Sequence, residues 1–506
     1  MSDFFDDELE TEKPEEEQEE TTEKRPKKKS GLLKITIYSV CVLIIASGCF
    51  LANRFIPKKK NGNSSSTAAE NTISVLTLDT SKIKTVSLEN PKGTLKLYSE
   101  KDGDSENWYV DGVKKELIST YSTSLIVSTA TNISATKEIT KLSAEECGLD
   151  DPSFKVELQK ADDSVVSFAV GKDASVGEGC YLKVDGKDEI YLVDASIKDD
   201  LNKEAIDLAE ADTIPKIEET DSIKSFFENG ELYGCDSITV TGKNYPKPLV
   251  IVENDDAQIS EYVRFKITSP DNHLADNIDP LFALFANGVA ASGAYSFHAN
   301  DLARFGLDSP DITVTMKLKN KTSTVKFSKQ DDENYAAWSN EGNLIYKVSY
   351  STIESVINSK ATDFYSKLVC FCSIDDLTDF NIKTSDNSYP FKIAANSDKD
   401  SEDKYVITGS KGKVDCQSFQ NLYQFIISLP CDDFSTVSGA SGEKITFEFK
   451  LKNGGVDTIE FVKVNETRFQ YFENGKAMGQ VSSTRLKKIL KYAEKLTNGE
   501  KISELN

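Results

Sequence analysis

The sequence predicts an α+β protein: three related modules of mostly antiparallel sheet with packed helices, preceded by one N-terminal transmembrane helix. Three observations support this prediction: an uncharged apolar stretch near the N-terminus, a Gly-Leu-Asp-x-Pro segment that occurs twice, and alternating apolar residues after each copy. Self-similarity at a period of about 150 residues indicates copies of one structural unit. Strand patterns mixed with helical runs are typical of layered α+β folds.

Residues 1–30 form an acidic tail with twelve Asp and Glu residues and few apolar ones. Such a composition cannot bury a core, so we expect the tail to be disordered. A basic cluster at its end would lie against anionic head groups of the lipid bilayer, or it is a plain stop-transfer flank.

Residues 31–56 are predicted to form a transmembrane helix. The stretch 35–52 has no charged residue, and about twenty apolar residues cross a bilayer as a helix. A cleaved signal peptide fits the long charged leader badly, which leaves a buried globular helix as the alternative. More basic residues precede the span than follow it, which predicts a single pass through the plasma membrane with a cytoplasmic N-terminus. The modules would then be extracytoplasmic, joined to the span by a small, polar linker at 57–72.

The first module is expected at 73–210, with the Gly-Leu-Asp-Asp-Pro segment at 148–152. Leu117, Tyr121 and Leu125 recur every four residues, which predicts a helix that buries these three side chains. Alternation then predicts strands. The remaining predicted elements are strands at 154–158, 165–170, 181–184 and 189–193, and a short helix at 196–201.

The second module is expected at 211–362, with Gly-Leu-Asp-Ser-Pro at 306–310. Ile278, Leu281 and Phe285 have helical spacing, and Leu284 extends the same run. The remaining predicted elements are strands at 312–316, 324–327, 335–338 and 344–348, and a short helix at 351–357.

The third module, expected at 363–506, has diverged. It lacks the Gly-Leu-Asp-x-Pro segment and has Ser-Gly-Ala-Ser-Gly at 438–442, where glycines can form a turn without the proline. The predicted elements are strands at 405–409, 445–449, 459–462, 468–472 and 478–481, and helices at 419–429 and 483–496.

Gly-Leu-Asp-x-Pro itself favours a structural role. The glycine would end a helical turn, the leucine would pack, and Asp-x-Pro would start a turn into the next strand. A surface recognition role is the alternative.

The charge balance argues against nucleic-acid binding. The whole chain has a formal net charge of −23, and the part after the predicted span is acidic as well. Nucleic-acid binding needs a basic surface. The balance fits a solvated exterior but does not identify a partner.

The nine cysteines do not form an evident disulfide framework. Cys41 and Cys49 fall in the predicted span, and the odd number left is unevenly spread over the modules. Cys370-Phe371-Cys372 is a weak hint of a metal or redox site, against the reading of ordinary buried thiols. Cys416 and Cys431 flank a predicted helix and would lie too far apart to bond.

No catalytic, cofactor or metal site is predicted, and we expect a protein that is not an enzyme. His273 and His298 are the only histidines, and the usual metalloprotease, phosphate-loop and serine-hydrolase motifs are absent from the sequence. Acidic runs at 102–106 and 398–402 lack the glycine and glutamate of a calcium loop and suggest hairpin turns. Ser-x-x-Lys at 81–84 and 410–413 is expected by chance.

The ordered set of these features resembles a known family. Residues 76–79 (Leu-Thr-Leu-Asp), Trp108, the segment 148–152, Tyr181 and residues 190–193 (Ile-Tyr-Leu-Val) are similar to the bacterial domain of unknown function DUF4340. The resemblance covers about 75–205 best and 236–360 less well. It implies a membrane-anchored envelope protein, in some members encoded beside ABC transporters of the gliding-motility type, and it implies no catalytic residues.

These observations lead to one expected function and one alternative. We expect an extracytoplasmic interaction or scaffold protein, accessory to an ABC-type transporter or envelope complex, because repeated modules present extended surfaces. The alternative is a protein that binds a small ligand or glycan, which a pocket lined by Trp108 or Trp338 would support. The competing interpretation places Trp108 in a module core.

Overall fold

The computed structural model describes residues 72–502, with gaps at 103–104, 176–178, 212, 216–234, 257–258, 261–262, 320 and 399–400. The predicted acidic tail 1–30, the membrane span 31–56 and the linker up to residue 71 lie outside the described residues. Within the described part, no helix combines the length and apolar character needed to cross a bilayer.

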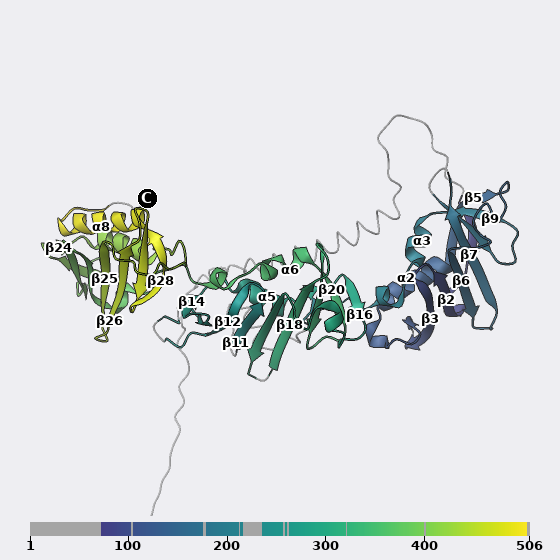
Figure 1. The fold of residues 1–506 in the computed structure, drawn as a ribbon, viewed down its shortest axis with the longest axis horizontal. Helices are drawn as coiled ribbons and strands as arrows, with labels where there is room; N and C mark the ends of the chain where they lie inside the picture. The colour runs from purple at the N-terminus through teal and green to yellow at the C-terminus, as the bar shows by residue number, and fades with distance from the viewer. Residues whose placement is uncertain are drawn as a thin grey trace, which may run out of the picture. The chain divides into compact units, whose positions relative to one another are not determined.

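The described chain forms three large sheets and one two-stranded sheet, all with antiparallel pairing (Figure 1). The prediction of a mostly antiparallel α+β fold is confirmed. The first sheet has the order β1-β5-β9-β8-β7-β6-β2-β3-β4. Its strands are β1 (Ile73–Thr77), β2 (Ile83–Asn90), β3 (Gly93–Asp102), β4 (Ser105–Val110), β5 (Asn132–Ile139), β6 (Phe154–Lys160), β7 (Val165–Asp173), β8 (Cys180–Val184) and β9 (Ile190–Val193).

The second sheet has the order β14-β13-β12-β11-β17-β18-β19-β20-β16, and β10 pairs separately with β15. The strands are β10 (Thr213–Ile214), β11 (Cys235–Gly242), β12 (Tyr245–Glu253), β13 (Phe265–Ser269), β14 (His273–Ala275), β15 (Val289–Ala290), β16 (Gly293–Ser296), β17 (Ile312–Leu318), β18 (Lys321–Lys329), β19 (Asn334–Ser339) and β20 (Ile345–Ser349).

The third sheet has the order β24-β23-β22-β21-β25-β26-β27-β28. Its strands are β21 (Leu377–Thr384), β22 (Ser388–Ala395), β23 (Tyr405–Gly409), β24 (Gly412–Val414), β25 (Lys444–Leu451), β26 (Val456–Lys463), β27 (Arg468–Glu473) and β28 (Lys476–Ser482).

All three large sheets share one plan. The first meander, of three strands in the first sheet and of four in the other two, runs outward from the centre. A second meander of four strands runs the other way, and the first strands of the two meanders pair: β2 with β6, β11 with β17, and β21 with β25. Each first meander is followed by one α-helix, and each second meander by another. The α-helices are α2 (Thr120–Thr131), α3 (Ser196–Leu201), α5 (Asp279–Ala286), α6 (Tyr350–Ile357), α7 (Cys416–Ile427) and α8 (Ser483–Thr497), and the 3₁₀ helices are η1 (Thr80–Lys82), η2 (Lys115–Leu117), η3 (Ala205–Leu208), η4 (Ala303–Phe305), η5 (Ala361–Phe364) and η6 (Ile374–Asp376).

One face of each sheet is apolar, as the alternating pattern predicted. In β6, Phe154, Val156 and Leu158 are buried, whereas Lys155 and Glu157 between them are exposed. Because successive side chains of a strand point to opposite faces, this pattern places one face of the sheet on a core and the other in solvent.

The predicted helix face in the first sheet region was wrong. Tyr121 and Leu125 are 68% and 45% exposed, and Leu117 is buried but belongs to η2 rather than to the helix. Instead α2 buries Ile126 and Val127, with small side chains on the same face. The helix starts only at Thr120. Counting the four-residue spacing from Leu117, which precedes the helix, therefore assigned the wrong side of α2 to the core.

The helix predictions in the other two regions are confirmed. In α5, Leu281, Leu284 and Phe285 are buried. In α7, Phe419 and Leu422 are buried, and the closing helix α8 begins and ends within a residue or so of its predicted bounds.

The glycine of Gly-Leu-Asp-x-Pro ends a helical turn in both copies, as predicted. Gly148 and Gly306 have φ of +69° and +70°, a left-handed conformation that favours glycine. The next amide closes the turn: Leu149 N donates to Ala144 O, and Leu307 N donates to Leu302 O, both at 2.8 Å. A Gly-Leu pair thus redirects the chain toward the next strand.

The motif also builds a second small core. Leu307 is fully buried and packs with Phe305, Ala336 and Ile345, apart from the main core of the second sheet. A comparable cluster in the first sheet region contains Leu149. The leucine of the motif therefore packs in both copies, as the structural interpretation expected.

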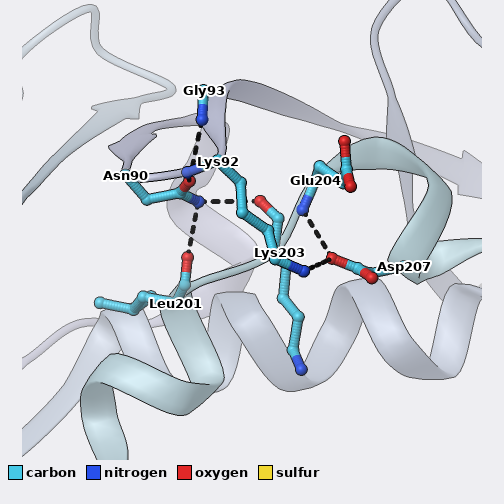
Figure 2. A network of polar contacts seen from close by, with 7 residues as sticks. All are labelled: Asn90, Lys92, Gly93, Leu201, Lys203, Glu204 and Asp207. Atoms are coloured by element: carbon cyan, nitrogen blue, oxygen red, sulfur yellow. Dashed lines mark hydrogen bonds and ion pairs between the residues drawn. The ribbon is translucent and has the colours of Figure 1, made fainter.

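Figure 2 shows a polar network that fixes the end of α3 to the first sheet. Asn90, the last residue of β2, donates from Nδ2 to Leu201 O and Lys203 O at 2.8 Å each. Its Oδ1 accepts hydrogen bonds from the amides of Lys92 and Gly93 at 2.8 and 3.2 Å. One side chain therefore closes the hairpin and holds the segment that leaves the sheet.

Asp207 completes this network. Its Oδ2 accepts from Lys92 Nζ at 2.7 Å and from the Glu204 amide at 3.0 Å. The second sheet repeats the contact, because Asn244 Nδ2, in the turn between β11 and β12, donates to Ile357 O at 3.0 Å. This repeated hairpin-to-helix bond was not predicted from the sequence.

Candidate functional site

The two histidines do not meet. His273 stacks on Tyr365 with ring centroids 3.9 Å apart, and burial, together with the charge of Lys476, lowers its pKa to about 4. His298 lines a separate cavity of about 510 Å³ with Lys114 and other residues. Among the described residues, no group of three or more His, Cys, Asp or Glu side chains is arranged to hold a metal ion.

The cysteines outside the predicted span are free thiols. Burial raises the pKa of Cys370 to about 12 and that of Cys372 to about 11. A thiol with a raised pKa stays protonated at neutral pH and is a poor nucleophile and metal ligand. Cys416 and Cys431 are also free and buried.

Cys370 and Cys372 line a cavity of about 200 Å³ that is also lined by carboxylates. Asp457 and Glu473 have raised pKa values, first because of burial and then because of nearby carboxylates. Mutual repulsion of this kind favours the protonated acids and supplies no reaction by itself.

The tryptophans do not line any of the cavities described for the part of the chain that the structure covers. Trp108 is 3% exposed and lies in the core of the first sheet, as the competing interpretation expected. Trp338 packs against the small cluster around Leu307, with Lys326 Nζ 5.2 Å from the centre of its ring system. These cavities therefore lend the ligand-binding alternative no support from either indole.

The strongest candidate surface is the outer side of α8 in the third sheet region. The sequence folds as a helix here because Leu486, Ile489, Ala493 and Leu496 recur at helical spacing and are buried. The solvent-exposed sides of the helix bear basic side chains, which we call the basic face. Its members are Arg485, Lys487, Lys488, Lys491 and Lys495.

The basic face is largely solvent-accessible. Arg485, Lys487 and Lys491 are exposed, and among the described residues none of the three has an ion-pair partner. Lys495 lies 4.0 Å from Glu500, a contact that is weak and screened by salt. The single acidic residue of α8 is Glu494, so the helix keeps a clear positive excess.

An aromatic pair flanks the basic face. Lys488 Nζ lies 5.2 Å from the ring centroid of Phe425 on α7 and 5.8 Å from that of Tyr492 on α8. The two rings meet edge to face with centroids 6.5 Å apart, and both side chains are half-buried. A cation over aromatic faces is held by the ring quadrupoles, so Lys488 is positioned as well as charged.

The sequence predicted the helix but not this surface. The signal was present as four lysines and one arginine within eleven residues of a chain that is acidic overall. Lysines at 487, 491 and 495 follow the i, i+4 spacing that places side chains on one stripe of a helix.

Comparison with known proteins gives one family. A family model described as "Domain of unknown function (DUF4340)" matches residues 108–232 and 266–441, more than half of the chain. No curated protein matches the chain, and no solved structure matches it.

Proposed function

The chain belongs to the DUF4340 family, and from that membership we propose that it is a single-pass, membrane-anchored scaffold protein with extracytoplasmic interaction modules. The modules would comprise residues 73–210, 211–362 and 363–506, one for each large sheet. The proposal places the protein as an accessory of an ABC-type transporter or another envelope complex.

The repeated strand order of the three sheets is the observation that carries the proposal. Each sheet buries one face and leaves polar side chains on the other, as in β6 and β17. Three copies of such a surface offer more contact area than one, which suits a protein that holds partners rather than one that converts a substrate.

The uncharged stretch at 35–52 supports the anchor, and its basic flanks support the orientation. An interaction protein held at a membrane meets membrane partners at a high effective concentration, so modest contacts suffice.

The scaffold is placed ahead of ligand binding because Trp108 is a core residue and Trp338 packs under Lys326. Neither indole lines one of the cavities described above, where a sugar or small molecule could contact it.

The test is to purify the full-length protein from its native membrane in mild detergent after brief cross-linking, and to identify what accompanies it by mass spectrometry. We expect stoichiometric recovery of a transporter or envelope subunit. Deletion of 75–500 should abolish that recovery, whereas removal of the acidic tail should preserve it. Recovery of no membrane protein above the deletion control would overturn the scaffold proposal.

The anchor has its own test. The full chain should resist extraction from membranes by alkaline carbonate, and replacement of two central residues of the stretch, Ile44→Lys and Ile45→Lys, should release it.

A further inference from the structure

We propose that the basic face of α8 docks on the surface of an anionic phospholipid bilayer. This inference deepens the proposed function, since it names one surface that would contact the membrane. It rests on the proposed function in one respect: the membrane anchor keeps the chain close to the bilayer.

The packing of α8 leaves Arg485, Lys487 and Lys491 exposed for such a contact. Leu486, Ile489 and Ala493 face the core of the third sheet, so Lys487 and Lys491 lie on the outer side of the helix, where both are exposed. Because α8 is about four turns long, its basic side chains are spread along the length of the helix instead of being gathered at one end.

Charge complementarity selects the chemistry of the partner. Basic side chains close to an anionic leaflet each strengthen binding about fivefold, and a cluster of four to eight is the pattern that anionic lipids attract. The basic face has five such residues. The rest of this acidic chain would be repelled by the same leaflet, so the contact would also orient the third sheet region.

The aromatic pair favours a bilayer over a soluble polyanion. Phe425 and Tyr492 are half-buried beside Lys488. Aromatic rings next to lysines are typical of surfaces that sit at the head-group level of a membrane, where one end is apolar and the other wet.

The surface is particular to the third sheet region. The corresponding closing helix of the first sheet, α3, contains Lys198 but also Asp199 and Asp200, and that of the second sheet, α6, contains only the acidic Glu354 among charged residues. A general property of the repeat would have placed lysines on all three closing helices.

The experiment uses the full-length chain in nanodiscs of either anionic or zwitterionic phospholipid. An amine-acetylating reagent is added, and the acetylation rate of each lysine is followed by mass spectrometry. We expect Lys487 and Lys491 to react at least fivefold more slowly in anionic discs, and we expect 0.5 M salt, a concentration at which the screening length falls to a few ångströms, to remove the difference. Lys137, Lys317 and Lys319, which are exposed on the other sheets, should react equally in both discs.

A triple variant tests the charges without disturbing the core. Arg485→Gln, Lys487→Gln and Lys491→Gln change exposed residues and keep good helix formers. The affinity for the anionic surface should fall on the order of 100-fold, from about fivefold for each charge. Lys495, which in the parent chain should also react more slowly in anionic discs, should then react equally in both discs. The matched control, Lys137→Gln, Lys317→Gln and Lys319→Gln, removes the same charge elsewhere and should leave Lys495 protected.

The outcomes separate the two proposals. Equal acetylation of Lys487 in both discs, with the chain still resistant to carbonate, would overturn the docking inference and leave the membrane anchor of the proposed function standing. Release by carbonate combined with protection of Lys487 by added anionic vesicles would overturn the membrane anchor and leave the docking inference standing. Protection by inorganic polyphosphate in zwitterionic discs, without protection in anionic discs, would assign the basic face to a soluble polyanion and overturn the lipid proposal.

Discussion

The first and third sheets each carry a twelve-residue helix after their first meander, and the two helices share four buried positions that different kinds of side chain occupy. Positions four, seven, eight and eleven are buried in both helices. In α2 the fourth position is Thr123, whose hydroxyl donates to Trp108 O at 2.8 Å. In α7 it is Phe419, whose ring lies 5.1 Å from that of Phe391.

The comparison shows that the repeat preserves geometry rather than side-chain volume. In the first sheet, the Thr123 hydroxyl hydrogen-bonds a backbone carbonyl of the edge strand β4. In the third sheet, an additional strand, β24, pairs with β23, and aromatic side chains such as Phe419 and Phe391 fill the core. The hydroxyl in the first sheet and the rings in the third meet the same requirement, because the edge strand and the buried face of the helix must both be covered.

The largest expected difference between the two regions comes from the fourth helix position. Phe419→Ala should lower the free energy of unfolding of the third sheet region by about 3–5 kcal/mol, because it leaves a cavity among closely packed rings. Thr123→Ala should cost about 1–3 kcal/mol in the first region, where one hydrogen bond is lost. Hydrogen exchange of peptides from α7 and α2 measures each region separately. Equal losses would show that the two cores are packed alike.

The second-largest difference in the free energy of unfolding is expected at the N-terminal caps of the two helices. Asp415 caps α7 and accepts a hydrogen bond from the Ser418 amide at 3.1 Å, whereas Ser119 makes no side-chain cap for α2. Asp415→Ala should cost about 1–2 kcal/mol at pH 7, and Ser119→Ala should cost less than about 0.5 kcal/mol.

The cap effect should depend on pH with a defined sign. Hydrogen bonds from Lys501 and Ser418 lower the pKa of Asp415 to about 2. Its contribution is therefore complete above the unfolded value of about 4 and is lost as the pH falls through 2. Denaturant unfolding of Asp415→Ala and the parent chain should converge near pH 2. A constant difference from pH 7 to pH 2 would contradict this assignment.

The turn glycines should give a smaller contrast. An added Cβ at Gly148 would lie 3.2 Å from Lys172 N, whereas Gly439, which also has a positive φ of +76°, has nothing within 4 Å. Gly439→Ala should cost about 1 kcal/mol from backbone strain alone, and Gly148→Ala about 2 kcal/mol. Thermal unfolding of the two variants provides the measurement, and a larger effect at Gly439 would show that the motif does not need a close approach.

The smallest expected effect tests the corrected helix face. Leu125→Asn introduces the residue that α7 has at the same position, and Leu125 is exposed. The change should alter the free energy of unfolding by less than about 0.5 kcal/mol. Ile126→Ala, one residue further and buried, should cost several times more, and the reverse order would restore the face first predicted.

The sequence was informative where one periodicity governed a whole element. The alternation around Phe154 and Ile312 located strands because a sheet with one buried face requires it. It was less informative for α2, because the core there accepts Thr123 and Ala130 and leaves Tyr121 outside, and small or polar residues give little signal of burial.

The candidate site was not predictable in the same way. The lysines of α8 are visible in the sequence, but their significance depends on how α8 packs, since the same residues would be partly hidden if another side of the helix faced the core. The cation–π contacts of Lys488 join residues of two helices far apart in the chain, and a single sequence contains no signal for such a pair.

The chain has two tryptophans, Trp108 in β4 of the first sheet and Trp338 in β19 of the second. One is sealed in a core, and the other lies beneath a lysine. Intrinsic tryptophan fluorescence therefore reports on the first two sheet regions and does not report on the third. A calorimetric transition without a matching change in emission would record the melting of the third region, and the protein thus needs no added dye to separate that event from the others.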